Sequence, residues 1–304
     1  MDLRQLRHFT AVAETLHFGR AAERLGMTQP PLSQSILALE RELGAPLFTR
    51  SKRVVALTAF GRQWLDHVRP AIAGVDALAE IARRLQAGTA GRLALSFVST
   101  ADYNLLPQLV QSYASAFPAV EITLLEATSD VQVEALIDGR VDAAILIPIQ
   151  PTMPAALRYR PLLREPLVAA VPEAWIGEGR VAVRAGSLHG EAWMAQPLII
   201  FPPRVSPDFH GLVLEFYRAQ GRTPAIRQEA IQMQTIISLV SAGMGMALVP
   251  ASMRNLVRTG VRYLDLAGPA PVLETGLAWR TGDDAPTLAA LIGMARSLGG
   301  GWTD

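Results

Sequence analysis

Residues 18–50 read FGRAAERLGMTQPPLSQSILALERELGAPLFTR, and this stretch indicates how the amino-terminal part of the 304-residue chain folds. Small residues at Ala21 and Ala22 allow one helix to lie closely across another, and Gly26 supplies the backbone freedom for a tight turn between helices. Thr28 suits a helix N-cap, and the two prolines that follow are tolerated in a first helical turn. The pattern predicts a helix-turn-helix.

The helix that starts near Thr28 has two chemically different faces. Its apolar stripe, at helical spacing, consists of Leu32, Ile36, Leu39 and Leu43. The opposite face carries short hydrogen-bonding side chains near the helix N-terminus, where a recognition helix meets base edges and phosphates in the major groove. The residues of this face are Gln29, Ser33, Gln34 and Ser35.

The segment after Gly44 predicts a short β-hairpin with a basic tip. Residues 45–58 contain two short strand-like runs around the cations Arg50, Lys52 and Arg53. Beside a recognition helix, such a wing would reach the flanking phosphates or the minor groove. A basic tripeptide also fits an ordinary exposed loop, and the adjacent helix-turn-helix favours the DNA interpretation.

From residue 58 to residue 85, apolar side chains recur at helical spacing without a loop signal, which predicts one long amphipathic helix. Positions 65, 68, 72, 75, 79 and 82 follow the spacing of a coiled-coil seam. Dimerisation is therefore the favoured interpretation, and packing against the chain's own body is the alternative. Pro70 is expected to kink this helix. Residues 88–91, with two glycines, predict a flexible hinge.

The remaining residues alternate between strand-like and helix-like segments. Such alternation predicts a parallel sheet covered by helices, here arranged as two α/β lobes with a cleft between them. The expected domains are a winged helix-turn-helix over 1–58, a linker helix over 59–88 and a two-lobed domain over 89–304. Lobe I is expected to take residues 92–161 and 268–304, and lobe II residues 162–267.

Pairs of hydroxyl residues follow two of the predicted strands. Ser99 and Thr100 follow the first strand, Thr128 and Ser129 follow the second, and each pair begins a predicted helix. Ligands of open α/β sheets bind at such positions, and two helix N-termini with their partial positive charge suit an anion, above all a carboxylate. A single Ser or Thr is more simply an N-cap, but the paired arrangement favours a ligand site.

The residues quoted from 18 to 50 closely resemble the DNA-binding head of LysR-type transcriptional regulators, and the resemblance continues through the linker into the body, where 243–250 match a family turn. The resemblance implies an all-α winged helix-turn-helix, a long linker helix and an α/β effector domain of the two-lobed periplasmic-binding-protein type. Gln34 stands where many members have an arginine. One phosphate or guanine contact is therefore either missing or replaced, with Arg20 as the candidate replacement. Carried over by position, the resemblance places Gln29, Pro30, Pro31, Ser33 and Gln34 at the groove and Arg50, Lys52 and Arg53 in the wing.

The same resemblance implies partners and ligand residues. Members bind promoter or operator DNA as dimers that pair into tetramers, and contact with RNA polymerase is expected. The body resembles regulators that sense muconates and other carboxylates of aromatic catabolism, with an amino acid or another metabolite as the alternative effector. This likeness implies an effector site formed by Ser99, Thr100, Thr128, Phe201, Pro202 and Pro203.

The composition of the chain limits its possible chemistry, partners and cellular location. The absence of cysteine excludes disulfides and thiolate chemistry. Residues 1–91 carry 12 Lys+Arg against 8 Asp+Glu (+4) and the remainder 16 against 19 (−3), which suits a polyanion partner for the head but also an ordinary solvated surface. No signal peptide or apolar run of roughly 18 residues occurs, so we expect a cytoplasmic protein without a membrane partner.

Rival functions lack support in the sequence. The five histidines show no metal-ligand spacing, and no phosphate loop, nucleophile elbow or dinucleotide fingerprint is present. We therefore predict no enzymatic activity, no metal and no cofactor. A plain solute-binding protein would not need residues 1–58.

Overall fold

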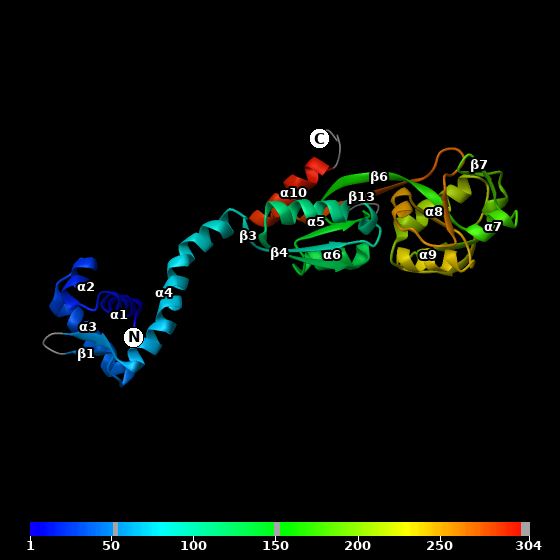
Figure 1. The fold of residues 1–304 in the computed structure, drawn as a ribbon. Helices are drawn as coiled ribbons and strands as arrows, with labels where there is room; N and C mark the ends of the chain where they lie inside the picture. Colours follow the sequence, from blue (N-terminus) through cyan, green and yellow to red (C-terminus); the bar gives the residue numbers. More distant parts are fainter. Residues whose placement is uncertain (51–53, 149–152, 299–304) are drawn as a thin grey trace. The chain divides into compact units, whose positions relative to one another are not determined.

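The computed structural model describes residues 1–50, 54–148 and 153–298. The chain forms two compact units, Met1–Arg84 and Leu85–Asp304 (Figure 1). The elements of the first unit, the last of which runs on into the second, are α1 (Leu3–Thr15), α2 (Phe18–Arg24), α3 (Gln29–Leu43), β1 (Phe48–Arg50), β2 (Val55–Leu57) and α4 (Ala59–Gln86). The predicted hairpin is present, because β1 and β2 pair as antiparallel strands.

Local sequence signals explain where the helices of the head begin and end. Asp2 and Gln5 form a capping box at the start of α1. Gly26 has a φ of 64°, a left-handed conformation that glycine adopts without steric cost, in the turn before α3. Thr28 is the N-cap of α3 by its backbone, as predicted, although its side chain makes no capping hydrogen bond.

The helices of the head pack around one apolar core. Leu32, Ile36 and Leu39 of α3 are fully buried in it, and Phe9 of α1 lies 4.9 Å, ring centre to ring centre, from Trp64 of α4. The first half of α4 contributes to the same core. Its second half instead exposes a row of apolar side chains: Val75, Leu78, Ile81 and Leu85.

One of the two sequence expectations about the linker is wrong. Helix α4 contains Pro70 and ends at Gln86, and the kink expected at Pro70 stays a prediction. The predicted hinge at 88–91 is part of a packed element, because β3 begins at Ala90. Gly88 is buried with a φ of 67°, and a Cβ added there would lie 2.8 Å from the backbone of Pro286. Glycine at this position therefore serves close packing.

The second unit contains a mixed sheet with strand order β11-β6-β13-β5-β3-β4, and β12 pairs with β6. Its strands are β3 (Ala90–Phe97), β4 (Ala119–Glu126), β5 (Ala143–Leu146), β6 (Leu157–Pro172), β11 (Ala247–Pro250), β12 (Val261–Leu264) and β13 (Val272–Arg280). Strands β4, β3 and β5 are parallel, whereas β13 is antiparallel to both β5 and β6. Within this sheet, the prediction of parallel strands holds only for β3, β4 and β5, because β13, β11 and β12 each run antiparallel to the strands they pair with.

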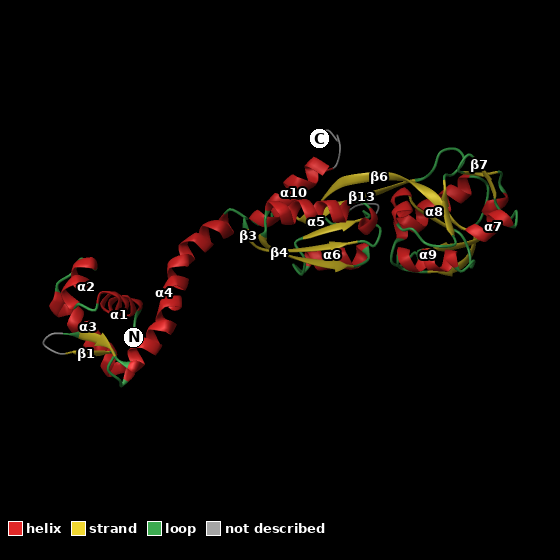
Figure 2. Ribbon diagram, in the orientation of Figure 1, coloured by secondary structure: helices red, strands yellow, loops and turns green. Residues whose placement is uncertain are grey.

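Helices cover the sheet of the first lobe on both faces (Figure 2). Helices α5 (Leu105–Ala116) and α10 (Pro286–Leu298) contact each other, and α6 (Ser129–Ile137) packs against β5. A short 3-10 helix, η1 (Ala101–Tyr103), precedes α5. The carboxyl ends of β3 and β4 therefore lead directly into η1 and α6.

Strand β6 is 16 residues long and connects the two lobes. Its first part pairs with β13, and its last part pairs with β11 and β12. The other elements of the second lobe are α7 (Glu173–Gly177), β7 (Ala182–Arg184), β8 (Ser187–His189), η2 (Ala192–Ala195), β9 (Pro197–Ile200), α8 (Pro207–Ala219), β10 (Ala225–Glu229), α9 (Met233–Ser241) and η3 (Ala251–Asn255). Strands β9 and β10 are parallel.

Among the residues that the structure describes, no helix is both long enough and apolar enough to cross a membrane.

Candidate functional site

The polar face of α3 is presented to solvent. Gln29, Pro30, Pro31 and Gln34 are exposed and Ser33 is half-buried. The opposite face of the same helix supplies the buried leucines and isoleucine of the core, and α1 and α2 both contact α3. The predicted groove-facing residues therefore lie together on one rigid, solvent-accessible surface.

Arg50, predicted as a wing cation, is held by its own domain. Its Nη2 donates to Glu40 Oε2 of α3 at 2.9 Å, and its guanidinium lies 4.9 Å from the centre of the Phe18 ring. The other oxygen of Glu40 accepts the backbone N–H groups of Leu47 and Phe48 at 2.8 and 3.1 Å. Glu40 thus ties the base of the hairpin to α3, a role that the sequence analysis did not find.

Of the other three cations predicted to contact DNA, only Arg20 lies among the described residues. Arg20 is exposed on α2, and its Nη2 donates to the carbonyl of Thr15 at 3.0 Å. Lys52 and Arg53 lie outside the described residues. The described part of the wing therefore shows its anchored base.

The cleft of the second unit contains a cavity of about 270 Å³. Four of the predicted effector residues line it, namely Ser99, Thr100, Thr128 and Phe201. Pro202 and Pro203 do not belong to the lining, but the Pro202 carbonyl accepts hydrogen bonds from the backbone of Val205 and Ser206, which do. The other lining residues are Val98, Glu126, Ala127, Ser129, Val131, Ile147, Val205, Ser206, Ile231 and Gln232.

Three helices begin at this cavity, since their N-cap residues Thr128 (α6), Ser206 (α8) and Gln232 (α9) all line it. None of these side chains makes a capping hydrogen bond. The expected helix start at Ser99 and Thr100 is different, because these residues precede the 3-10 helix η1 and Asn104 caps α5. The additional helix N-termini come from the second lobe. The Ser206-Pro207 pair is a recognisable helix-start signal that could have revealed one of them.

The hydroxyl groups of the cavity differ in their hydrogen-bond partners. Ser129 Oγ accepts the N–H of Ile147 at 3.2 Å, and Ser99 Oγ accepts that of Met233 at 3.5 Å across the cleft. Thr100 is only 2% exposed, and its Oγ1 has no hydrogen-bond partner in the described structure. A buried hydroxyl without a partner has hydrogen-bonding capacity to offer a ligand.

The lining of the cavity includes one acidic side chain. Glu126 is the only ionisable residue among the described residues that line it. Gln232 Nε2 donates to Glu126 Oε1 at 3.4 Å across the cleft. Burial, and secondarily the negative charge of Glu126, raise the pKa of the nearby Asp102 carboxyl above its usual value.

Buried polar contacts hold the walls and the crossing strand in place. His210 Nδ1 lies 2.7 Å from the carbonyl of Phe201, and because a carbonyl only accepts, this nitrogen donates. Glu165 of β6 is buried and accepts from Asn104 Nδ2 at 2.9 Å and from the N–H of Ser252 at 2.7 Å. These bonds connect the loop after β9 and the crossing strand β6 to their supporting elements.

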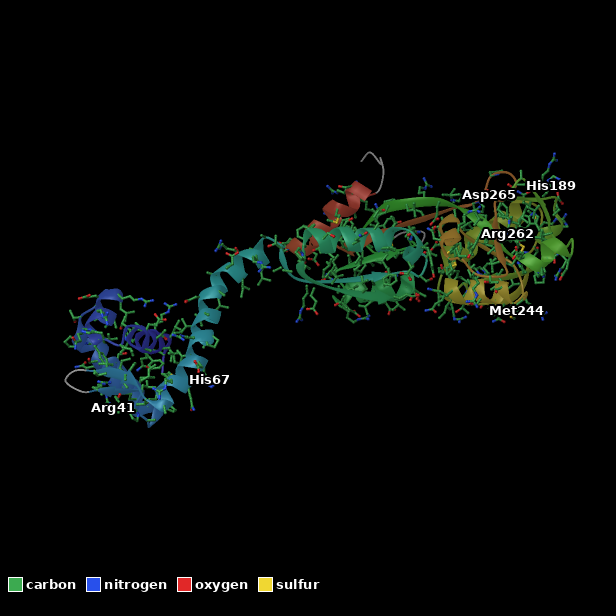
Figure 3. All side chains as sticks on the ribbon, in the orientation of Figure 1. Arg41, His67, His189, Met244, Arg262 and Asp265 are labelled. Carbon is green, nitrogen blue, oxygen red and sulfur yellow. The ribbon has the colours of Figure 1, made fainter. Side chains whose placement is uncertain are left out.

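No group of three or more His, Cys, Asp or Glu able to hold a metal ion occurs in the described parts of the chain. His67 on α4 and His189 on β8, for example, are exposed side chains on separate elements (Figure 3). The described lining of the cavity consists of hydrogen-bonding groups, apolar side chains and one carboxylate.

Two family models match most of the chain. Residues 3–62 match the model of the bacterial regulatory helix-turn-helix proteins of the lysR family, and residues 86–299 match the LysR substrate binding domain. The chain is 61% identical over 300 residues to the HTH-type transcriptional regulator IlvR of Caulobacter vibrioides, covering 98% of this chain and 99% of IlvR. It is 38% identical over 292 residues to AlsR of Bacillus subtilis, covering 96% and 94%.

The fold also matches a solved protein–DNA complex. The crystal structure of full-length CbnR complexed with its target DNA aligns with a TM-score of 0.76 and 26% identity, covering 98% of this chain and 100% of CbnR. The relatives are named as transcriptional regulators, which is a non-enzymatic role. The chain belongs to the LysR family of DNA-binding transcriptional regulators with an effector-binding domain.

Proposed function

We propose that this regulator changes transcription in response to a small carboxylate bound in the cleft cavity. The observation that carries the proposal is the convergence of the N-termini of α6, α8 and α9 on one cavity. Each helix N-terminus carries partial positive charge and free N–H groups, which together bind anions. In this proposal Ser99, Thr100 and Thr128 donate to the carboxylate.

The loop after β9 would close the site from the second lobe. Phe201 supplies an apolar wall, while Pro202 and Pro203 shape the turn that brings Val205 and Ser206 to the cavity. A ligand shifts the balance between open and closed lobes only through its different affinity for the two states. Closure would then alter the geometry of the DNA-binding heads.

For the head, we propose that α3 enters the major groove. Gln29, Pro30, Pro31, Ser33 and Gln34 would face the bases, as their shared exposed surface supports. Arg20, Lys52 and Arg53 would neutralise phosphates. Because Arg50 already pairs with Glu40, its contribution would be to hold the wing in position.

The exposed apolar row of α4 supports self-association. Val75, Leu78, Ile81 and Leu85 are each more than 40% exposed, and a second copy of α4 would cover them. We propose a dimer through α4, paired into a tetramer through the bodies, acting in the cytoplasm and contacting RNA polymerase at the promoter.

A gel-shift assay tests the proposal with the DNA upstream of the regulator's own gene and a panel of small monocarboxylates, dicarboxylates and amino acids. Thr128→Ala should keep its DNA affinity and lose the effect of the active compound. Thr223→Ala, an exposed position outside the cavity, is the matched control and should respond as the unaltered protein does. An unchanged response of Thr128→Ala to every compound would show that the effector site lies elsewhere.

A further inference from the structure

The helix N-termini at the cavity attract an anion, whereas the carboxylate of Glu126 repels one. The three helix N-termini, the hydroxyl side chains and Glu126 at the end of β4 all line it, and the N-cap residue of α9, Gln232, contacts Glu126. No lysine, arginine or histidine occurs among its described lining residues. A ligand with two carboxylates would place one of them against Glu126 without a counter-charge, which like-charge repulsion disfavours.

Glu126 is exposed, and its charge meets no cationic side chain among the described lining residues. Its recorded contact is the 3.4 Å hydrogen bond from the neutral amide of Gln232. Asp102 is a second acidic group nearby, and burial first and the charge of Glu126 second raise the pKa of its carboxyl. Arg204 lines an adjoining hollow rather than this cavity, and its Nη1 lies 3.7 Å from Glu229 Oε2.

Thr100 is a lining residue with unused hydrogen-bonding capacity. Among the described residues, its buried Oγ1 has no hydrogen-bond partner. The rest of the surface is mainly aliphatic, with one aromatic ring. Its apolar side chains are Val98, Val131, Ile147, Val205, Ile231 and Phe201.

We infer that the effector is a small zwitterion of the α-amino-acid class, with its carboxylate at the helix N-termini, its ammonium group at Glu126 and an aliphatic side chain against the apolar wall. The inference rests on the proposed function, because it assigns the ligand class of the same cavity. An ammonium group supplies three donors and the positive charge that the lining lacks. Gln232 donates to Glu126 from the other lobe, so a ligand bound at Glu126 would also affect the contact between the lobes.

Calorimetric titration of the full-length protein tests the inference with matched probes. The first probes are L-alanine, L-valine and L-leucine. Each is paired with the 2-hydroxy acid that differs only in carrying a hydroxyl in place of the ammonium group, and cis,cis-muconate represents the dicarboxylates. At least one amino acid should bind about tenfold more tightly than its hydroxy-acid partner, the size expected for one charge-assisted hydrogen bond.

Glu126→Gln removes the charge while keeping the shape of the side chain. This variant should weaken amino-acid binding about tenfold and leave the hydroxy acid unchanged or slightly tighter. Glu134→Gln on α6 makes the same charge change at an exposed position outside the cavity and should leave both affinities as they are. Circular dichroism of both variants verifies that they remain folded.

The outcomes separate this inference from the proposed function. Equal binding of each amino acid and its hydroxy acid, with no effect of Glu126→Gln, would overturn the zwitterion assignment, and loss of that binding in Thr128→Ala would leave the carboxylate site standing. Preferred binding of muconate would likewise overturn the zwitterion assignment alone. Absence of binding by every probe overturns the amino-acid class.

Discussion

The head and the body of this regulator build their binding surfaces in opposite ways. The proposed DNA surface is the outer face of one continuous helix, α3, whose inner face is buried in the core of its own unit. The cleft cavity collects single residues from the ends of β3, β4 and β5 and from the starts of α6, α8 and α9. A surface carried on one helix follows from local periodicity, whereas a surface assembled from distant segments depends on how the sheet is connected.

This comparison predicts that damage to the core of the head should spare the body. Ile36 is fully buried behind the polar face of α3, so Ile36→Ala should destabilise the head by about 2–5 kcal/mol and abolish DNA binding. The body should keep its affinity for effector, because it forms a separate compact unit. Gel shift, effector titration and thermal unfolding measure the three effects.

The neighbouring Leu37→Ala is the matched control, since Leu37 is 46% exposed on the same helix. It should change the free energy of unfolding by about 0.5 kcal/mol or less. Simultaneous loss of effector binding in Ile36→Ala would contradict the independence of the two units.

A second, smaller effect concerns the anchoring of the wing. Glu40→Gln keeps a side-chain oxygen for the backbone of the hairpin but loses the charged partner of Arg50. We expect a loss of about 1–2 kcal/mol in the stability of the head, because the largely buried Glu40 loses its charge in three hydrogen bonds while solvent screens the more exposed Arg50. Chemical denaturation followed by tryptophan fluorescence measures it.

DNA affinity should fall with Glu40→Gln even though the variant is less negative. Glu23→Gln removes the same charge from an exposed position on α2 and should bind DNA at least as tightly as the unaltered protein. If the two variants bound DNA equally well, Glu40 would have no positioning role and Arg50 would be free to contact phosphate.

The smallest expected effect concerns the loop that follows β9 and begins at Phe201. His210→Leu removes the donor to the Phe201 carbonyl, so the loop should lose part of its ordering and effector binding should weaken by about 1 kcal/mol. DNA affinity without effector should stay unchanged. His189→Leu, at an exposed position of β8, is the control, and an equal effect of both variants would contradict the role assigned to His210.

Residue patterns predicted the head and the long helix well, because their signals are local. The turn at Gly26, the helix start at Thr28 and the buried stripe of α3 all appear where the sequence places them. The role of Glu40 was not predicted from the sequence. Its real partners follow it by 7 to 10 positions, across a turn whose geometry the sequence does not specify.

Prediction of the cleft was less complete. Ser99, Thr100, Thr128 and Phe201 were expected at the site and line the cavity, whereas Glu126, Ser206 and Gln232 were not expected. Glu126 is the last residue of a strand, a place where an acidic side chain ordinarily indicates only exposure to solvent. Nothing in its neighbours along the chain shows that Gln232, over 100 residues later, lies within hydrogen-bond distance.

The sequence by itself determined the helix-turn-helix, the amphipathic linker and the two-lobed α/β class, because periodicity, caps and turn residues act over a few positions. Only the tertiary structure decided that β13 enters the sheet antiparallel, that Glu40 holds the wing and that three helix N-termini meet a carboxylate in one cavity. These features depend on contacts between distant segments, and the free energy of such contacts is set by the packing of the whole unit.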